Sequence, residues 1–205
     1  MTEAATVEHE EHGGGAHYTA TGLDNRKLAM WGFLGSECLL FGALISAYLL
    51  YRGRGTGTKP IDVYDIPYTS VSSFVLLMSS LTMVLALSAL QRRDERQSRV
   101  WLTATALLGM TFIGGQVYEF TVFVHEGVSL TANPASSAFF VLTGFHGTHV
   151  TLGIIMLLSL VGMSLAGKLK PENSLVLELV GLYWHFVDIV WVVIFTVVYL
   201  MPGPS

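Results

Sequence analysis

Three ionisable residues, Glu178, His185 and Asp188, lie inside one long apolar segment, residues 175–200. At about 100° per residue, a helix places the three side chains within a sector of roughly 80°, on one face. Carboxyl and imidazole groups can transfer protons, form charge-assisted hydrogen bonds or bind metal ions. A charged group at membrane depth costs on the order of 3 kcal/mol or more unless it faces protein or water. We therefore expect this face to meet polar partners elsewhere in the chain.

Two other apolar segments carry polar groups at a matching depth. Glu37 lies about 13 Å, and His185 about 15 Å, from the edge at which their segments begin. His146 and His149 belong to a segment that runs the opposite way, and lie roughly 13 and 18 Å from the other edge. These four groups could therefore meet near the middle of a membrane.

The polar set is compatible with a metal site, a structural or lipid-contacting network, or proton handling. His146 and His149 could ligate one ion, with His185 and Glu37 completing the shell. However, the sequence has neither a His-Glu-x-x-His motif nor a pair of cysteines. Imidazole and carboxylate groups can also satisfy each other without an ion. We assign no metal site and no catalytic residue, and we favour the network.

Desolvation disfavours the charged form of a carboxyl group, so we expect Glu37 to be protonated or hydrogen-bonded. Gln116 and Glu119 share one face of a further segment, nearer the opposite edge, and are secondary candidates for the network. The candidate residues of the network are Glu37, His146, His149, Glu178, His185 and Asp188.

The composition predicts an all-α, polytopic membrane protein. Of the 205 residues 52% are hydrophobic and 13% charged, and the apolar residues form long runs. Five runs reach the ~20 residues that a spanning helix needs; they cover residues 28–50, 71–90, 100–124, 137–166 and 175–200. We expect a five-helix transmembrane domain at 28–201, after a mobile acidic tail at 1–27. His9, His12 and His17 fit a solvated tail better than a weak metal site.

Lysine and arginine residues predict the orientation. Eight lie on the side of the N-terminus and three on the other side, which places the N-terminus in the cytoplasm and the C-terminus outside. The prolines fall in connectors or at the chain end, and no inverted repeat is evident. Both features count against a transporter. Nothing in the composition suggests binding to nucleic acid.

Small and aromatic residues accompany the polar set. The glycines predict close helix approach; they are Gly32, Gly35 and Gly42 near Glu37, and Gly144 and Gly147 near the histidine pair. Serine hydroxyls in residues 71–90 are expected to serve packing. Trp184 and Trp191 are interpreted as packing residues or lipid-facing anchors rather than a cofactor site. Cys38 is interpreted as a small core residue, and as a single cysteine it excludes an internal disulfide.

Three stretches resemble subunit III of haem-copper respiratory oxidases. They read WGFLGSECLLFGALISAYLLYR, SAFFVLTGFHGTHVTLGIIML and YWHFVDIVWVVIFTVVYL. The resemblance covers all five helices. Mitochondrial-type members have seven helices, and this chain begins where their third would. Five-helix forms occur among bacterial cytochrome c oxidases and among quinol oxidases.

The resemblance implies a subunit in a bacterial plasma membrane that has no haem or copper of its own. In this family, haem a and copper belong to subunits I and II, which reduce oxygen to water. Subunit III packs on subunit I, holds phospholipids, supports proton uptake and protects the active site during turnover. A cytochrome bc complex is a further expected partner.

By the same resemblance, Glu37 takes the place of the family's buried carboxylate. His146, His149, His185 and Asp188 occupy its characteristic polar positions. The expected function is that of a non-catalytic subunit III in a proton-pumping cytochrome c oxidase of the aa3 type, part of the aerobic electron transport chain (respiratory complex IV). A quinol oxidase is the alternative of the same class, and a small transporter or ion channel is the alternative of another class.

Overall fold

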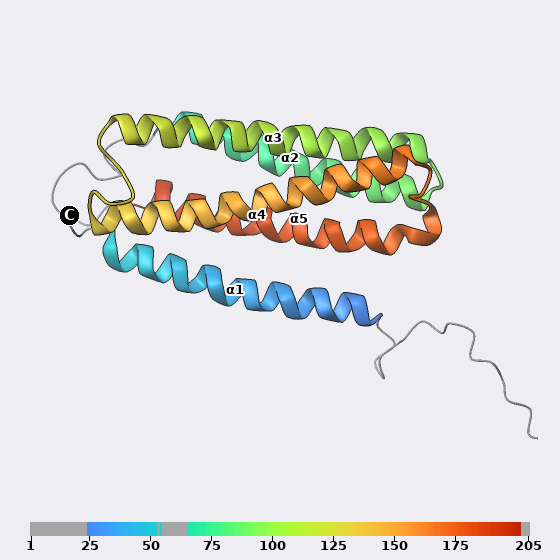
Figure 1. Cartoon of the computed structure of the whole chain (residues 1–205), viewed down its shortest axis with the longest axis horizontal. Helices are drawn as coiled ribbons and strands as arrows, with labels where there is room; N and C mark the ends of the chain where they lie inside the picture. Colours follow the sequence, from blue (N-terminus) through green and yellow to red (C-terminus); the bar gives the residue numbers. More distant parts are fainter. Residues whose placement is uncertain (1–23, 53, 55–64, 202–205) are drawn as a thin grey trace, which may run out of the picture.

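The chain folds into long antiparallel helices that run the length of the molecule (Figure 1). The computed structural model describes residues 24–52, 54 and 65–201. The helices are α1 (Asn25–Tyr51), α2 (Ile66–Gln91), α3 (Glu95–His125), α4 (Pro134–Leu165) and α5 (Ser174–Phe195). A 3₁₀ turn, η2 (Pro171–Asn173), precedes α5, and a π-helical turn, η3 (Thr196–Leu200), continues it. Five spans are long and apolar enough to cross a membrane, which confirms the predicted all-α, polytopic fold. The tail histidines His9, His12 and His17 lie outside the described residues.

The helices start up to five residues earlier than the apolar runs, because polar residues form their first turns. Before each of α1 to α4, an aspartate or asparagine side chain accepts a hydrogen bond from a backbone N–H two or three residues later. Such caps satisfy amide groups that have no partner within the helix. The capping residues are Asp24, Asp65, Asp94 and Asn133.

Left-handed residues end three of the helices. Arg93, Gly127 and Gly167 follow α2, α3 and α4 with φ values of 64°, 84° and 67°. After α3, the amide of Gly127 bonds to the carbonyl of Val124 and that of Val128 to Phe123, the paired pattern that closes a helix end. Glycine adopts this conformation without steric cost, so the chain reverses sharply and consecutive helices run antiparallel.

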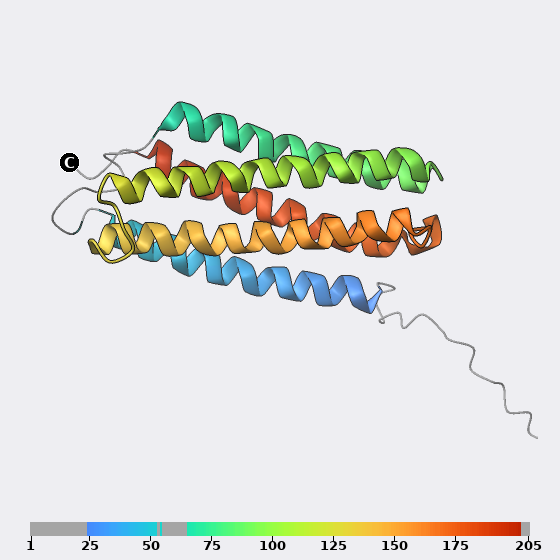
Figure 2. The same cartoon turned by 45° about the horizontal axis from the view of Figure 1, so that its top comes forward.

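Helix α1 lies at the edge of the bundle, against α4 and α5 (Figures 1 and 2). Its buried residues, Leu34, Phe41 and Tyr48, are seven positions apart and form a single seam. Most of the rest of α1 is exposed. Cys38 belongs to this exposed surface, so its interpretation as a core residue is wrong: a helix attached along one seam covers few of its own positions.

Two tryptophans of α5 form the centre of the bundle. Trp184 and Trp191 are each 1% exposed, and their indole N–H groups donate to the hydroxyls of Ser79 and Ser73 on α2, both at 2.9 Å. The packing interpretation is therefore confirmed for both residues, and the lipid-facing one is wrong. The α2 serines serve this packing, as expected, by accepting the indole protons.

Glycines make room for the indole of Trp184. A Cβ atom at Gly109 of α3 or at Gly153 of α4 would lie 2.7 Å from a ring carbon of Trp184, closer than van der Waals contact allows. The glycines predicted to mediate close approach behave differently. No atom lies within 4 Å of a Cβ placed at Gly32, Gly35, Gly42, Gly144 or Gly147, so that prediction is wrong for contacts within this chain.

Gly153→Ala is expected to lower the free energy of unfolding by about 2 kcal/mol, because the added methyl group overpacks a rigid indole. The matched control is Gly162→Ala, in the same helix, where a Cβ would meet open space. The control should leave stability unchanged or slightly raise it. Thermal unfolding in mild detergent measures both, and equal effects would contradict this account of the core.

Candidate functional site

The pair Glu37 and His149 joins α1 to α4. Oε2 of Glu37 lies 3.1 Å from Nε2 of His149, and the side chains are 15% and 13% exposed. The ring of Phe41 covers His149 edge-on at 5.1 Å between centroids. The hydroxyl of Tyr183 donates to the backbone carbonyl of His149 at 3.0 Å. Residues from α1, α4 and α5 thus position the pair. The hydrogen bond between Glu37 and His149 confirms the expectation that Glu37 is protonated or hydrogen-bonded.

The geometry determines how protons can be arranged in this pair. Nδ1 of His149 lies 2.8 Å from the carbonyl oxygen of Phe145. A carbonyl only accepts, so Nδ1 carries a proton. At Nε2, an imidazolium can face a carboxylate, or a neutral imidazole can face a protonated carboxyl group. Both arrangements carry no net charge, and the proton of the contact can rest on either residue, which suits a site within a membrane.

His146, one turn before His149 on α4, has different surroundings. It is fully buried, and its ring stacks on Trp191 with 4.9 Å between centroids. Phe112 and Phe41 meet it edge-on at 6.1 and 6.4 Å. Neither ring nitrogen has a hydrogen-bond partner. His146 therefore packs as an aromatic ring, and is not joined to the Glu37 and His149 pair by a hydrogen bond.

The three ionisable residues of α5 have separate partners or none. Glu178 forms a 2.7 Å ion pair with Lys27 of α1, at side-chain exposures of 36% and 31%, so it is not a buried group. Nδ1 of His185 lies 2.6 Å from the hydroxyl of Ser80 on α2. Asp188 is 4% exposed, and neither of its carboxyl oxygens has a hydrogen-bond partner. The helix face that carries these residues meets α1 at Glu178 and α2 at His185, so the three side chains do not form one group.

The secondary candidates form a compact cluster near the ends of α2, α3 and η3. Glu119 is 5% exposed and accepts hydrogen bonds from Thr69 at 2.9 Å, Tyr199 at 3.0 Å and Gln116 at 2.8 Å. Thr69 belongs to α2 and Tyr199 to η3, whereas Gln116 belongs to α3, the helix of Glu119 itself. The expectation that Gln116 and Glu119 share a face is confirmed by their direct bond. This carboxyl group ties three elements together.

The four groups expected to meet in the middle of the membrane do not form one cluster. Glu37 meets His149, His185 meets Ser80, and His146 lies among aromatic rings. Within the described ranges no three histidine, cysteine, aspartate or glutamate side chains gather to hold a metal ion. The arrangement can neutralise buried charge and share a proton within a pair.

Sequence reasoning missed the partners that are not ionisable at neutral pH. Ser80, Thr69, Tyr183 and Tyr199 each bond to a candidate residue or to its backbone. Serine, threonine and tyrosine occur throughout these helices, so their type gives no signal. Only the positions of Thr69, Ser73 and Ser79 on the buried face of α2 could have indicated an inward polar stripe.

Comparisons with known proteins identify relatives of this chain. The family described as "Cytochrome c oxidase subunit III" matches residues 5–202. "Probable quinol oxidase subunit 3" of Staphylococcus saprophyticus is 37% identical over 97% of this chain and 96% of its own length. "Cytochrome c oxidase subunit 3" of Bacillus sp. (strain PS3) is 39% identical over 86% of each chain. "Quinol oxidase subunit 3" of Bacillus spizizenii is 38% identical over 95% of this chain and 98% of its own length.

Tyr199→Phe is expected to lower the free energy of unfolding by about 2 kcal/mol, because it removes one of three hydrogen bonds from a buried carboxyl group. Tyr118→Phe is the matched control: Tyr118 is adjacent to Glu119 in sequence but 62% exposed. Thermal unfolding of both variants provides the test. If the two variants lose the same stability, the Tyr199 hydroxyl does not contribute through Glu119.

Proposed function

Because the chain belongs to the cytochrome c oxidase subunit III family, we propose that it is a non-catalytic subunit of a proton-pumping aerobic terminal oxidase. Relatives from that family are subunits of both cytochrome c and quinol oxidases, so the chain is a subunit III of the haem-copper oxidase class. It is a multi-pass membrane protein, and its family implies a complex with subunit I and others.

The Glu37 and His149 pair is the observation that carries the proposed role. It connects α1, the least buried helix, to the bundle at the middle of the membrane. The pair can hold its proton on either residue without a change in net charge. We assign it two tasks: it fixes α1 in place, and it supports proton uptake by the subunit that reduces oxygen.

A non-catalytic role agrees with how the polar groups are used. The imidazole of His149 and the carboxyl groups of Glu37 and Glu119 bond to groups of this same chain. In the proposal, haem and copper belong to subunits I and II of the complex, and no step of oxygen reduction is routed through this chain.

Cytochrome c is the proposed electron donor of the complex, with haem a in subunit I. This is supported by the relative from Bacillus sp. (strain PS3), named a cytochrome c oxidase subunit, at 39% identity. Quinol is the second candidate donor, because relatives named as quinol oxidase subunits match this chain over 95–97% of its length. The proposed location is a bacterial plasma membrane, with the N-terminus in the cytoplasm and phospholipid bound to the subunit.

A reduced-minus-oxidised absorption spectrum tests the assignment. The complex that co-purifies with this chain in mild detergent is expected to show haem a and to oxidise reduced cytochrome c. Haem o or b without haem a, together with quinol oxidation, would replace cytochrome c by quinol as the donor. A folded preparation without any haem would contradict the oxidase assignment itself.

Glu37→Ala is expected to leave the initial rate of oxygen consumption largely unchanged and to shorten the time for which the enzyme remains active. The reason is that α1 loses its mid-membrane bond while the catalytic metals lie in other subunits. Glu126→Ala, at the exposed end of α3, is the control and should behave as the wild type. Continuous oxygen uptake by the assembled complex measures both quantities. Immediate and complete loss of activity in a fully assembled variant would contradict an accessory role.

A further inference from the structure

A groove of about 320 Å³ lies between the middle of α3 and the middle of α4. On α4 it extends from Thr143, about 14 Å from the start of the helix, to Leu152, about 20 Å from its end. The groove therefore lies within the hydrocarbon layer, away from both membrane surfaces. Its wall includes Gln116 and Val117 of α3, and Gly144, Gly147, Thr148 and Thr151 of α4.

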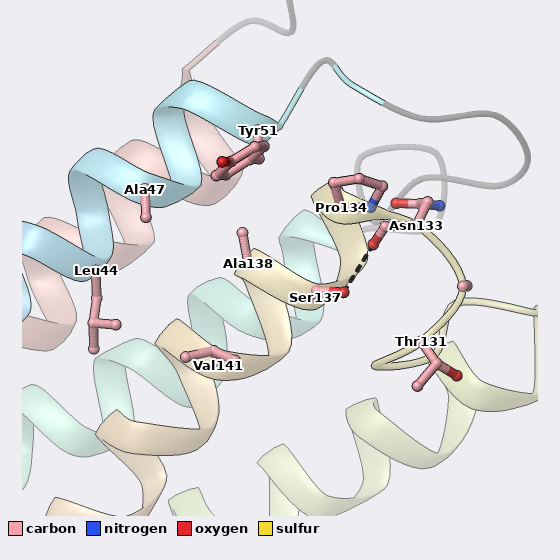
Figure 3. Close-up of a pocket in the computed structure, with 10 residues that line it drawn as sticks. Leu44, Ala47, Tyr51, Thr131, Asn133, Pro134, Ser137, Ala138 and Val141 are labelled. Carbon is pink, nitrogen blue, oxygen red and sulfur yellow. Dashed lines mark hydrogen bonds between the residues drawn. The ribbon is translucent and has the colours of Figure 1, made fainter.

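A larger cavity beside α4 has different polar groups. It has a volume of about 640 Å³ and lies between the last turns of α1 and the start of α4 (Figure 3). At its rim, the hydroxyl of Ser137 is bonded to the backbone carbonyls of Leu130 and Asn133. In the described ranges, none of the buried polar atoms without a partner belongs to a residue that lines this cavity. The groove between α3 and α4 does contain such a residue.

That residue is Gln116, whose amide is held in one orientation. Gln116 is 7% exposed, and its Nε2 donates to Oε2 of Glu119 at 2.8 Å. Glu119 is itself held by the hydroxyls of Thr69 and Tyr199. Oε1 of Gln116 then has no hydrogen-bond partner among the residues that the structure describes. Because an unpaired amide oxygen in hydrocarbon is costly, a donor from outside the chain would stabilise it.

The threonines of the groove do not supply this donor. The hydroxyls of Thr148 and Thr151 donate to backbone carbonyls one turn earlier in α4, at 2.9 and 2.8 Å. Their oxygens can still accept a hydrogen bond. The described lining residues include no carboxylate, so a cationic donor would be buried without a counter-charge. An acyl chain carries no donor at all. The best occupant is therefore a group that brings an uncharged donor to this depth.

The α4 wall of the groove is shaped for a helix. No described atom lies within 4 Å of a Cβ atom placed at Gly144 or Gly147, so the groove is open at both positions. With Thr148 and Thr151, these glycines form two pairs of small residues four positions apart, a spacing that lets helix backbones approach closely in lipid. Both glycines were predicted to mediate close approach, and their open side is free for a helix from another chain.

We propose that the groove between α3 and α4 seats a transmembrane helix of another subunit, which donates a hydrogen bond from a serine, threonine or tryptophan side chain to Oε1 of Gln116. The proposal rests on the proposed function, which places this chain in an oxidase complex. It adds the surface at which a partner helix docks and the chemistry by which that surface recognises it.

Photo-crosslinking in the assembled complex identifies the occupant. A benzophenone maleimide is attached to Val117→Cys in a Cys38→Ser background, because Val117 lines the groove and is 61% exposed. The control is Val71→Cys on α2, which is 65% exposed and lines a different groove. Val117→Cys is expected to form an adduct with an apolar helix of one partner subunit, and Val71→Cys is expected not to label that helix. Adducts with lipid alone, or with a second copy of this chain, would overturn the proposal.

Native mass spectrometry of the purified complex tests the close approach of the helix. Gly147→Leu fills the groove and is expected to lose the cross-linked subunit. Gly114→Leu introduces the same side chain at an open position of α3 that does not line the groove, and is expected to keep that subunit. Full retention of the subunit in Gly147→Leu would contradict docking at this surface.

The missing donor is tested by Gln116→Met, which is expected to raise the fraction of complexes without the cross-linked subunit about fivefold. Tyr199→Phe also removes a bond to Glu119 but leaves the Gln116 oxygen in place, and is expected not to change this fraction. Equal losses in the two variants, or none in Gln116→Met, would overturn the assigned hydrogen bond. The haem spectrum is recorded in parallel. A normal spectrum with an unaffected partner would overturn the docking site alone, whereas a wild-type complex without haem would overturn the proposed function.

Discussion

A polar group placed within a hydrocarbon layer is stabilised by a hydrogen-bond partner inside the protein, and several features of this structure follow from that requirement. The indole N–H groups of Trp184 and Trp191 reach serine hydroxyls on α2. The carboxyl group of Glu119 collects three donors, and Glu37 meets His149. Except for the bond from Gln116 to Glu119 within α3, each of these contacts joins two different elements, so they satisfy polar groups and pack the helices together at once. The apolar core alone would not select which helix faces which, because lipid is as apolar as leucine.

Helix α1 shows how such contacts can attach a peripheral element. An ion pair with Glu178 holds its first turn, the bond to His149 holds its middle, and the seam of Leu34, Phe41 and Tyr48 packs on the bundle. The attachment is narrow, so most of the helix stays exposed and a cavity remains beside its last turns. In the proposed function, Glu37 on this helix fixes α1 to the bundle and supports proton uptake. The exposed face of α1 and the cavity both derive from its attachment along a single seam.

The pairing of imidazole with carboxyl also explains why the proposed role is supportive. Either distribution of the proton leaves the Glu37 and His149 pair neutral, so the pair can be formed at membrane depth with little electrostatic cost. The candidate groups are distributed over several helix contacts rather than gathered at one point. That distribution suits a scaffold that keeps neighbouring subunits and lipid in place, with the chemistry of oxygen reduction assigned to partner subunits.

The sequence by itself determined the number of spanning helices and their alternation of direction, because these depend on run length and on the short connectors between the runs. Its motifs also indicated the family. Only the tertiary structure decided the partners. The rise per residue predicts one level for Glu37, His146, His149 and His185, but the rotation of each helix places His146 in an aromatic cluster and His185 against Ser80. The glycines that matter, Gly109 and Gly153, were not those beside the charged residues, because their role depends on an indole from a distant part of the chain. The rotation of each helix and the contacts of its side chains depend on the helices packed against it, and only the tertiary structure shows which helices these are.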